Sequence, residues 1–294
     1  MPSLRDMRSR IASVKNTQQI TRAMKMVSAA KLRRAQEQII NMRPYAQRIF
    51  QIVTDVALTR QVEHPLLTAP QRTSRVLLIV VTSDRGLCGG FNNGICRFTE
   101  KFIRDYKNTY EKMDFIFIGK KGADYFRRRG VSARQVILNL AREISYKMAS
   151  GMASTCMSEF TAGDYDEVRF IYNEFKSAIS QKLVSERILP IDLAKVSSES
   201  AAGRAAASPN MIFEPAPKDM IDQLLNQHFS TQVFRCMAES VAAEHAARMT
   251  SMENATKNAK EMIGKLTLTY NKLRQASITK ELIEICSGAE AVSD

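Results

Sequence analysis

The first sixty residues carry a sustained apolar seam with spacings of three and four residues. This spacing is the heptad pattern of a coiled-coil helix. A helix of about 55 residues would be roughly 80 Å long. The seam positions are Leu4, Met7, Ile11, Val14, Gln18, Thr21, Lys25, Ser28, Leu32, Ala35, Ile39, Met42, Ala46, Ile49, Val53 and Val56.

Two features modify this seam. Between Gln18 and Ser28 the seam positions become polar or small, and the apolar residues shift to Met24, Met26 and Val27. Either the partner helix is held loosely there, or these side chains contact a different surface. A proline at position 44 would break or kink a helix. Because the seam keeps its phase across that proline, we expect a kink.

The C-terminal end repeats the pattern. From Pro217 to Gly288 only Gly264 interrupts a helix-forming composition, so we expect a helix that starts at Pro217 and stops at Gly288. Two long amphipathic helices at opposite ends of a chain bury their stripes most simply against each other, as an antiparallel coiled coil. The C-terminal seam comprises Met252, Ala255, Ala259, Met262, Leu266, Thr269, Leu273 and Ala276.

The middle of the chain alternates strand and helix patterns. This alternation predicts a small doubly wound, mostly parallel α/β domain inserted between the helices, so the fold class is α/β (α+β overall). The domains are residues 1–60, 61–214 and 215–294, and residues 197–210 are expected to form a mobile loop. The expected strands are 75–82, 115–119, 167–172, 179–191 and 211–213, and the expected helices are 93–106, 120–129 and 143–162.

Charge is concentrated at the N-terminus. The net charge is +13, and residues 1–60 hold twelve Lys or Arg against three Asp or Glu, whereas residues 216–290 hold nine of each sign. A basic segment favours an acidic partner: nucleic acid, anionic lipid or an acidic protein surface. The five scattered cysteines indicate free thiols in a reducing compartment. We expect no metal, no cofactor and no membrane span, because the longest strongly apolar run is only Val76–Val81.

The loop Gly86–Gly94 is the main candidate for chemistry. It follows the first strand and precedes a helix, which is the position of a phosphate-binding loop. Its glycine spacing does not match the known phosphate-loop patterns, so a tight turn that displays a protein-contact surface is the favoured interpretation. Cys88 within it is either a reactive thiol near a helix N-terminus or, more simply, a small residue that fills the turn. The segment Gly119–Gly122 is interpreted as a strand end that runs into a basic helix.

Catalytic motifs are missing from the sequence. No nucleophile elbow, zinc-protease motif or paired-carboxylate arrangement is present. The three histidines His64, His228 and His245 are far apart and are expected to be ordinary surface or core residues. A mechanical or assembly role therefore fits better than catalysis.

Several long strings resemble the gamma subunit family of F-type ATP synthases, in order and over nearly the whole chain. Chloroplast members carry an additional dithiol segment, and the lack of such a cysteine pair here favours a bacterial type. The strings are RIASVKNTQQITRAMKMV at 10–27, RPY at 43–45, SDRGLCGGFN at 83–92, EHAARM at 244–249 and YNKLRQASITKEL at 270–282.

The resemblance implies a non-catalytic central-stalk rotor, peripheral to the cytoplasmic face of the bacterial inner membrane. It would transmit rotation between the membrane c-subunit ring and the α3β3 head during proton- or sodium-driven ATP synthesis, hold the ε subunit, and meet the membrane only through the complex. It implies contacts to β subunits by Met24, Lys25, Arg248, Arg274, Gln275 and Thr279. The loop residues Asp84, Arg85, Cys88, Gly89 and Gly90 are expected to form a protein-contact surface.

This assignment explains how a chain without catalytic groups can act. A shaft biases three β subunits differently only through differential contacts with their conformations. A basic helix that faces acidic β surface gives an attraction without fixed geometry, which suits a rotating contact. The alternative is a basic coiled-coil protein that binds nucleic acid or acts as a scaffold. It explains the basic first segment but not the neutral second helix, so no nucleic-acid partner is expected. A nucleotide-binding enzyme is the other rival.

Overall fold

The computed structural model describes residues 3–60, 64–67, 73–140, 144–177, 180–191 and 217–293. The loop expected at 197–210 and the strand expected at 211–213 lie outside the described residues. The chain forms two compact units. The helix-pair unit comprises Met1–Ser28 and Arg248–Asp294, and the α/β unit comprises Ala29–Ala247. The division into domains 1–60, 61–214 and 215–294 stays a prediction.

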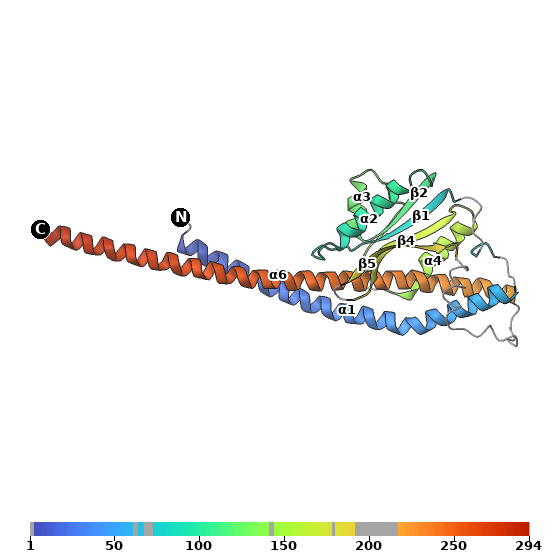
Figure 1. Cartoon of the computed structure of the whole chain (residues 1–294), viewed down its shortest axis with the longest axis horizontal. Helices are drawn as coiled ribbons and strands as arrows, with labels where there is room; N and C mark the ends of the chain where they lie inside the picture. Colours follow the sequence, from blue (N-terminus) through green and yellow to red (C-terminus); the bar gives the residue numbers. More distant parts are fainter. Residues whose placement is uncertain are drawn as a thin grey trace. The chain divides into compact units, whose positions relative to one another are not determined.

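The α/β unit is built on a five-stranded sheet of order β3-β2-β1-β4-β5. Strands β1 (Arg75–Val81), β2 (Lys112–Ile118), β3 (Gln135–Ile137) and β4 (Glu167–Phe175) are parallel neighbours, and β5 (Gln181–Leu189) pairs with β4 in the antiparallel sense. The predicted mostly parallel sheet is therefore confirmed (Figure 1). The sequence analysis missed β3, a strand of three residues with only one partly buried side chain.

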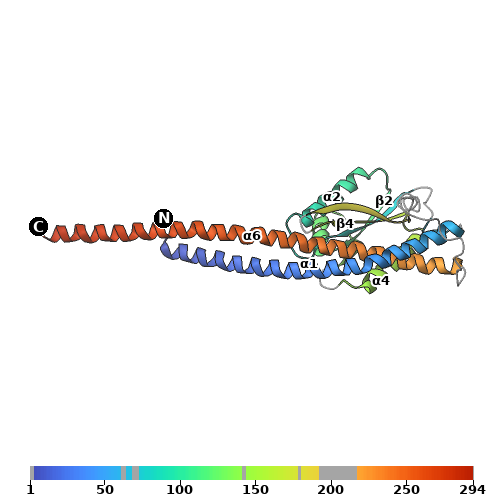
Figure 2. The same ribbon diagram turned by 60° about the horizontal axis from the view of Figure 1, so that its bottom comes forward.

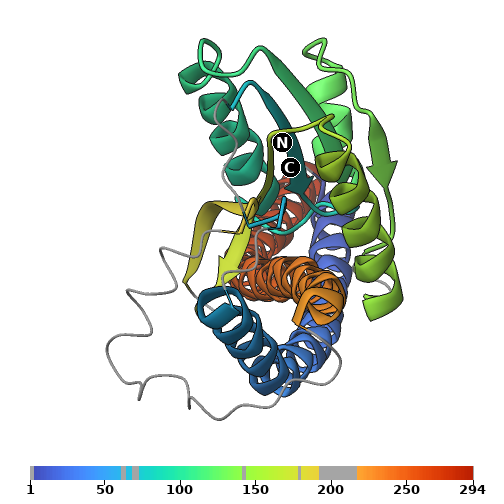
Figure 3. The same cartoon turned by 90° about the vertical axis from the view of Figure 1, so that its right-hand side faces the viewer.

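Among its described residues this unit also contains three short helices: α2 (Phe91–Asp105), α3 (Lys120–Arg127) and α4 (Tyr146–Thr161). Helices α2 and α3 cover the sheet face that carries Val76, Leu78 and Val80. Successive residues on both faces of β1 are buried, as expected for a parallel strand covered on both sides. Helix α4 packs beside α6 (Figure 3), where the rings of Tyr146 and Phe234 lie 6.1 Å apart.

The two long helices are α1 (Leu4–Arg60) and α6 (Pro217–Ser293). Helix α1 is unbroken through Pro44, and the kink expected there stays a prediction. The predicted start of α6 at Pro217 is confirmed, but the predicted stop at Gly288 is wrong, because the helix continues to Ser293. A glycine ends a helix where it adopts a left-handed conformation; inside a helix it costs only about 1 kcal/mol relative to alanine.

In the helix-pair unit α1 and α6 are antiparallel. Arg8 Nε donates to Tyr270 Oη over 2.8 Å, and Lys25 Nζ lies 2.6 Å from Glu253 Oε1. As the residue number rises on α1, the number of its partner on α6 falls. Figures 1 and 2 show the two segments side by side, with the C-terminal end of α6 continuing beyond the N-terminal end of α1. In the α/β unit the same helices meet where Phe50 stacks on His228.

The seam on α1 is confirmed, because all of its predicted positions are buried or partly buried. The seam on α6 is correct at five of its eight positions. Met262, Thr269 and Ala276 are exposed, whereas the other five are buried or partly buried: Met252, Ala255, Ala259, Leu266 and Leu273. The C-terminal neighbours of the three exposed residues, Ile263, Tyr270 and Ser277, take the inner positions. At each of these three positions the next residue is about equally able to face inward, so the partner helix selects between adjacent residues. Within the described residues, no helix combines the length and apolarity needed to cross a membrane.

Candidate functional site

Along the polar stretch of the α1 seam, hydrogen bonds join α1 to α6. Thr21 and Ser28 are buried, and the Thr256 hydroxyl donates to Thr21 Oγ1 over 2.8 Å. Lys25 adds the contact to Glu253 across the pair. Small side chains with satisfied hydroxyls allow the two helices to approach closely. The helices are therefore in contact along this stretch.

The apolar side chains displaced from the seam point to solvent. Met26 is 60% exposed, Val27 is 57% exposed and Ile20 is 61% exposed. A soluble helix pair with no partner would normally carry polar residues at such positions. This agrees with the second expectation for the stretch, that these residues contact a different surface.

A shallow groove of about 630 Å³ runs across both helices at the same level. Arg22, Lys25, Lys257 and Lys260 line it, and Glu253 is its acidic residue. Because Glu253 is paired with Lys25, the groove keeps a net positive charge. Cationic side chains beside exposed apolar ones provide a surface for an acidic protein segment.

The six residues expected to contact β differ in accessibility. Arg274, Gln275 and Thr279 are exposed on α6, and Met24 and Lys25 are partly buried on α1. Arg248 is only 8% exposed, so its guanidinium is largely enclosed within this chain. The structure thus brings Met24 and Lys25 to one level of the pair, and places Arg274, Gln275 and Thr279 farther along α6.

The segment 281–287 near the end of α6 is exposed on all sides. Ile278, Leu282, Ile283 and Ile285 are each at least half exposed. Described residues 281–287 are exposed without exception, so α1 does not cover this segment. Exposed apolar side chains gathered on one helix segment are typical of an interaction surface.

The loop after β1 is held internally. Asp84 Oδ1 accepts from the Lys120 amide over 3.0 Å and Oδ2 accepts from the Asn139 amide over 2.8 Å. The Asp84 carboxylate thereby links the segments that follow β1, β2 and β3. The Cys88 side chain is buried and receives a hydrogen bond from Asn92 Nδ2. This geometry agrees with the structural interpretation of Cys88 rather than with an accessible thiol.

The tip of the same loop is accessible. Arg85, Leu87, Gly89 and Gly90 are exposed, and Leu87 and Gly89 have positive φ. Positive φ at a leucine is uncommon and turns its side chain outward, here 62% exposed. The loop therefore presents an apolar tip beside an arginine, which agrees with the protein-contact interpretation.

Two glycines expected to lie at a strand end serve close packing. A Cβ at Gly119, where φ is 97°, would lie 2.3 Å from the Thr82 carbonyl oxygen. A Cβ at Gly122 would lie 2.7 Å from Thr82 Oγ1, which accepts a hydrogen bond from the Gly122 amide. The segment is thus a tight junction between β2 and α3, as the sequence indicated.

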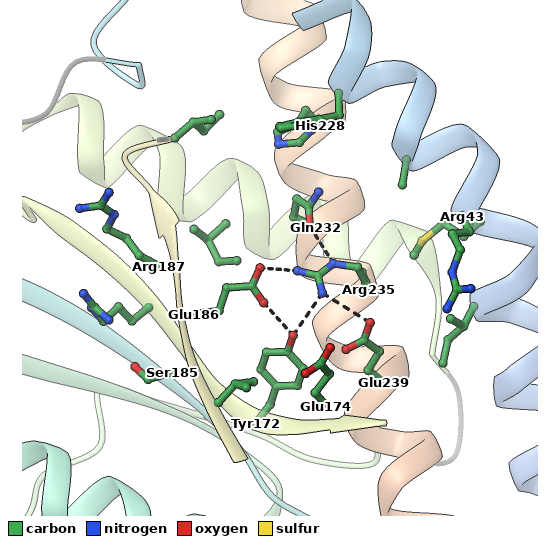
Figure 4. A pocket seen from close by; sticks show the side chains of 18 of the residues that line it. Arg43, Tyr172, Glu174, Ser185, Glu186, Arg187, His228, Gln232, Arg235 and Glu239 are labelled. Atoms are coloured by element: carbon green, nitrogen blue, oxygen red, sulfur yellow. Dashed lines mark hydrogen bonds and ion pairs between the residues drawn. The ribbon is translucent and has the colours of Figure 1, made fainter. Parts of the chain in front are cut away.

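Sequence reasoning missed a largely buried polar network around the buried Tyr172 in the α/β unit (Figure 4). The Tyr172 hydroxyl donates to Glu186 Oε2 over 2.7 Å, and Arg235 pairs with both Glu186 and Glu239. Gln232 accepts from Arg235 Nε over 2.8 Å. Burial raises the pKa of Tyr172 and of Glu239. No local pattern could have identified this network, because its members come from β4, β5 and α6.

The histidines divide into two kinds. His64 pairs with Asp222 over 2.8 Å and His245 is buried, as expected for ordinary residues. His228 is also buried, but its Nδ1 has no hydrogen-bond partner among the described residues. Burial and the nearby charge of Arg235 lower the pKa of His228 to about 4.

The chain was compared with known proteins. A family model described as ATP synthase matches residues 3–292. The ATP synthase gamma chain of Bdellovibrio bacteriovorus is 56% identical over 293 residues, with 99% of each chain covered. A chain in the central stalk/c-ring structure of the Tetrahymena thermophila mitochondrial ATP synthase has a TM-score of 0.59 and 26% identity, covering 80% of this chain and 99% of that one.

A chain of the Euglena gracilis mitochondrial ATP synthase shares the fold over a greater length. It has a TM-score of 0.66 and 24% identity, and covers 98% of this chain and 94% of that one. These findings agree with a shaft and do not favour a basic coiled coil that binds nucleic acid. The chain therefore belongs to the ATP synthase gamma chain family.

Proposed function

We propose that this chain is the central-stalk rotor subunit of a bacterial F-type ATP synthase. It transmits rotation between a membrane c-subunit ring and an α3β3 catalytic head, holds an ε subunit, and has no catalytic site of its own. It lies at the cytoplasmic face of the inner membrane and is attached only through the complex. Support comes from the family membership and from the solved relatives, whose descriptions name a central stalk, a c-ring and F1.

The observation that carries the proposal is the exposed apolar and basic surface of the helix-pair unit. Ile20, Met26 and Val27 are exposed next to the positive groove that Lys25 lines. Such a surface attracts an acidic segment over a distance and leaves room for it to slide. We propose that Met24 and Lys25 lie on the face that passes the acidic segment of β.

The remaining contacts follow the length of α6. We propose that Arg274, Gln275 and Thr279 contact β, since their side chains are exposed in the C-terminal part of α6. Arg248 is enclosed, so we propose that it acts on β by fixing the surface of the helix pair around it. We propose that Arg85, Gly89 and Gly90 contribute to a protein contact at the loop tip, while Asp84 and Cys88 hold the loop in shape.

The first test is co-purification. A tagged form of the chain is expected to recover α and β subunits in a complex of three α, three β and one copy of this chain. That complex hydrolyses ATP and the isolated chain does not. Recovery of nucleic acid in place of α and β, at physiological salt, would reject the rotor function.

The second test addresses the sliding surface. Met24→Lys adds a charge to the proposed sliding face and is expected to lower proton-driven ATP synthesis in membrane vesicles. Leu138→Lys is the control, because Leu138 is a half-exposed leucine in the α/β unit. Unchanged coupling in Met24→Lys, with the complex assembled at its normal level, would contradict a role for this face.

A further inference from the structure

The α/β unit contains a cavity of about 1030 Å³ that the proposed rotor contacts do not use (Figure 4). Four elements form its walls: α1, β4, β5 and α6. The network of Tyr172, Glu186 and Arg235 lies along one side, and His228 lies toward one end. The cavity is large enough for several amino-acid residues.

Polar atoms in its wall lack partners. His228 is 5% exposed, and its Nδ1 forms no hydrogen bond with a described residue. Ser185 Oγ and Glu239 Oε2 are likewise buried and unpartnered within the described part of the chain. Buried polar atoms are nearly always satisfied, so each of these three atoms needs a hydrogen-bond partner, and their residues all line this cavity.

The rim of the cavity is positively charged. Arg43 on α1 and Lys182 on β5 line it, and neither forms an ion pair with a described residue. The inner carboxylates Glu186 and Glu239 are already paired with Arg235. The charge left for a ligand at the rim is therefore positive, and an acidic group complements it.

The edge of the sheet faces the same space. Strand β5 is last in the order β3-β2-β1-β4-β5 and pairs only with β4 among the described strands. Consecutive residues from Val184 to Ile188 line the cavity, so the strand presents its backbone as well as its side chains. An antiparallel edge strand offers the N–H and C=O groups of every second residue to a further strand.

We propose that this cavity and the outer edge of β5 bind an extended acidic segment of another polypeptide chain, which adds to the sheet as a sixth strand. Main-chain groups of the segment pair with β5, and its acidic side chains meet Arg43 and Lys182. Its remaining polar groups satisfy His228 and Ser185. The site lies in the α/β unit, so the inference goes beyond the rotor contacts proposed on the helix pair and does not depend on them.

Other ligands fit less well. A small anion would neutralise the positive charge of the rim. It would leave Glu239 Oε2 without a hydrogen-bond donor and most of the cavity volume empty. A nucleic acid carries a phosphate at every nucleotide, so part of its charge would face Glu174, Glu186 and Glu239, which all line the cavity. A polypeptide can instead keep its acidic side chains at the positive rim. A polypeptide supplies alternating donors and acceptors at the spacing of a strand.

The first experiment compares amide hydrogen exchange of β5 in the isolated full-length chain and in the purified complete ATP synthase. We expect exchange at every second amide from Lys182 to Ile188 to slow at least tenfold in the complex. Equal exchange in both samples overturns the proposal. Protection already complete in the isolated chain also overturns it, because a segment of the same chain would then cover the edge.

The second experiment identifies the occupant. A photoreactive benzoylphenylalanine at position 185 is activated in the complete complex, and the attached peptide is sequenced. Attachment to an acidic segment of another subunit in extended conformation supports the proposal. Attachment to this chain, to a helical segment or to lipid overturns it.

A matched pair of charge reversals tests the rim. Arg43→Glu is expected to abolish most of the protection of β5 in the complex, and Arg104→Glu on α2 is expected to leave it unchanged. Both arginines are exposed, so neither substitution should prevent folding. Equal protection in the two variants overturns the role of the basic rim. The subunit ratio of each complex separates this result from a failure of rotor assembly.

Discussion

Lowering the pH from 7 to 5 should destabilise the α/β unit through His228. This side chain is buried, its ring stacks on Phe50 at 5.2 Å, and its pKa is lowered from 6.5 to about 4 by burial and by the charge of Arg235. The unfolded chain takes up a proton below pH 6.5, whereas the folded chain does so only near pH 4. The free energy of unfolding therefore falls as the pH falls through this window.

The magnitude follows from the two pKa values. A difference of one pKa unit corresponds to about 1.4 kcal/mol, so the full loss is roughly 3 kcal/mol once the pH is below 4. Between pH 7 and pH 5 the linkage relation gives a loss of about 2 kcal/mol from this one group. Acidic groups elsewhere in the chain also titrate at low pH. A variant that lacks only the imidazole shares that titration, so the difference between the two proteins isolates the contribution of His228.

The assay is urea unfolding of the isolated chain at pH 7 and pH 5, followed by circular dichroism. His228→Phe keeps an aromatic ring beside Phe50 and cannot be protonated. On acidification the free energy of unfolding of the wild type should fall by about 2 kcal/mol more than that of this variant. If the two proteins show the same pH dependence, the imidazole is not held neutral by its surroundings and the reasoning is refuted.

Two other substitutions probe the packing of the α/β unit. Gly122→Ala should lower the free energy of unfolding by about 1–3 kcal/mol, since its Cβ would lie 2.7 Å from Thr82 Oγ1. Gly151→Ala, on an open helix face, should raise it by about 0.5–1 kcal/mol in the same urea titration, and equal effects would contradict the packing argument. Arg235→Leu should lower the free energy of unfolding by about 1–3 kcal/mol, because Glu186 and Glu239 lose a partly buried partner. Calorimetry checks this value, and a loss below about 1 kcal/mol would show that these ion pairs contribute little.

Most of the secondary structure could be predicted from local sequence patterns. The α1 seam was read correctly at every position because a heptad repeat with strong apolar residues fixes which side of a helix is buried. Strands β1, β2 and β4 were found because apolar, β-branched runs are typical of parallel strands that are covered on both faces. Strand β5 was also predicted, although it is an antiparallel strand at the edge of the sheet. Strand β3 escaped because three residues carry too little pattern.

Only part of the candidate site could be predicted from the sequence. The basic character of α1 and the shift of apolar residues to Met26 and Val27 are visible in the sequence. The burial of Arg248 and the internal role of Asp84 are not, because they depend on residues far away in the chain. The same holds for the cavity beside β5, whose walls come from four separate elements.

The sequence by itself thus determined two long helices, an inserted α/β domain and a basic N-terminal segment. Each of these depends on periodicity or composition within one stretch of chain. Tertiary structure decided the phase of the α6 seam, the continuation of α6 through Gly288 and the partners of Arg235. These depend on which surfaces meet, and residues such as Met262 and Ile263 are equally able to face inward until a partner helix selects one of them.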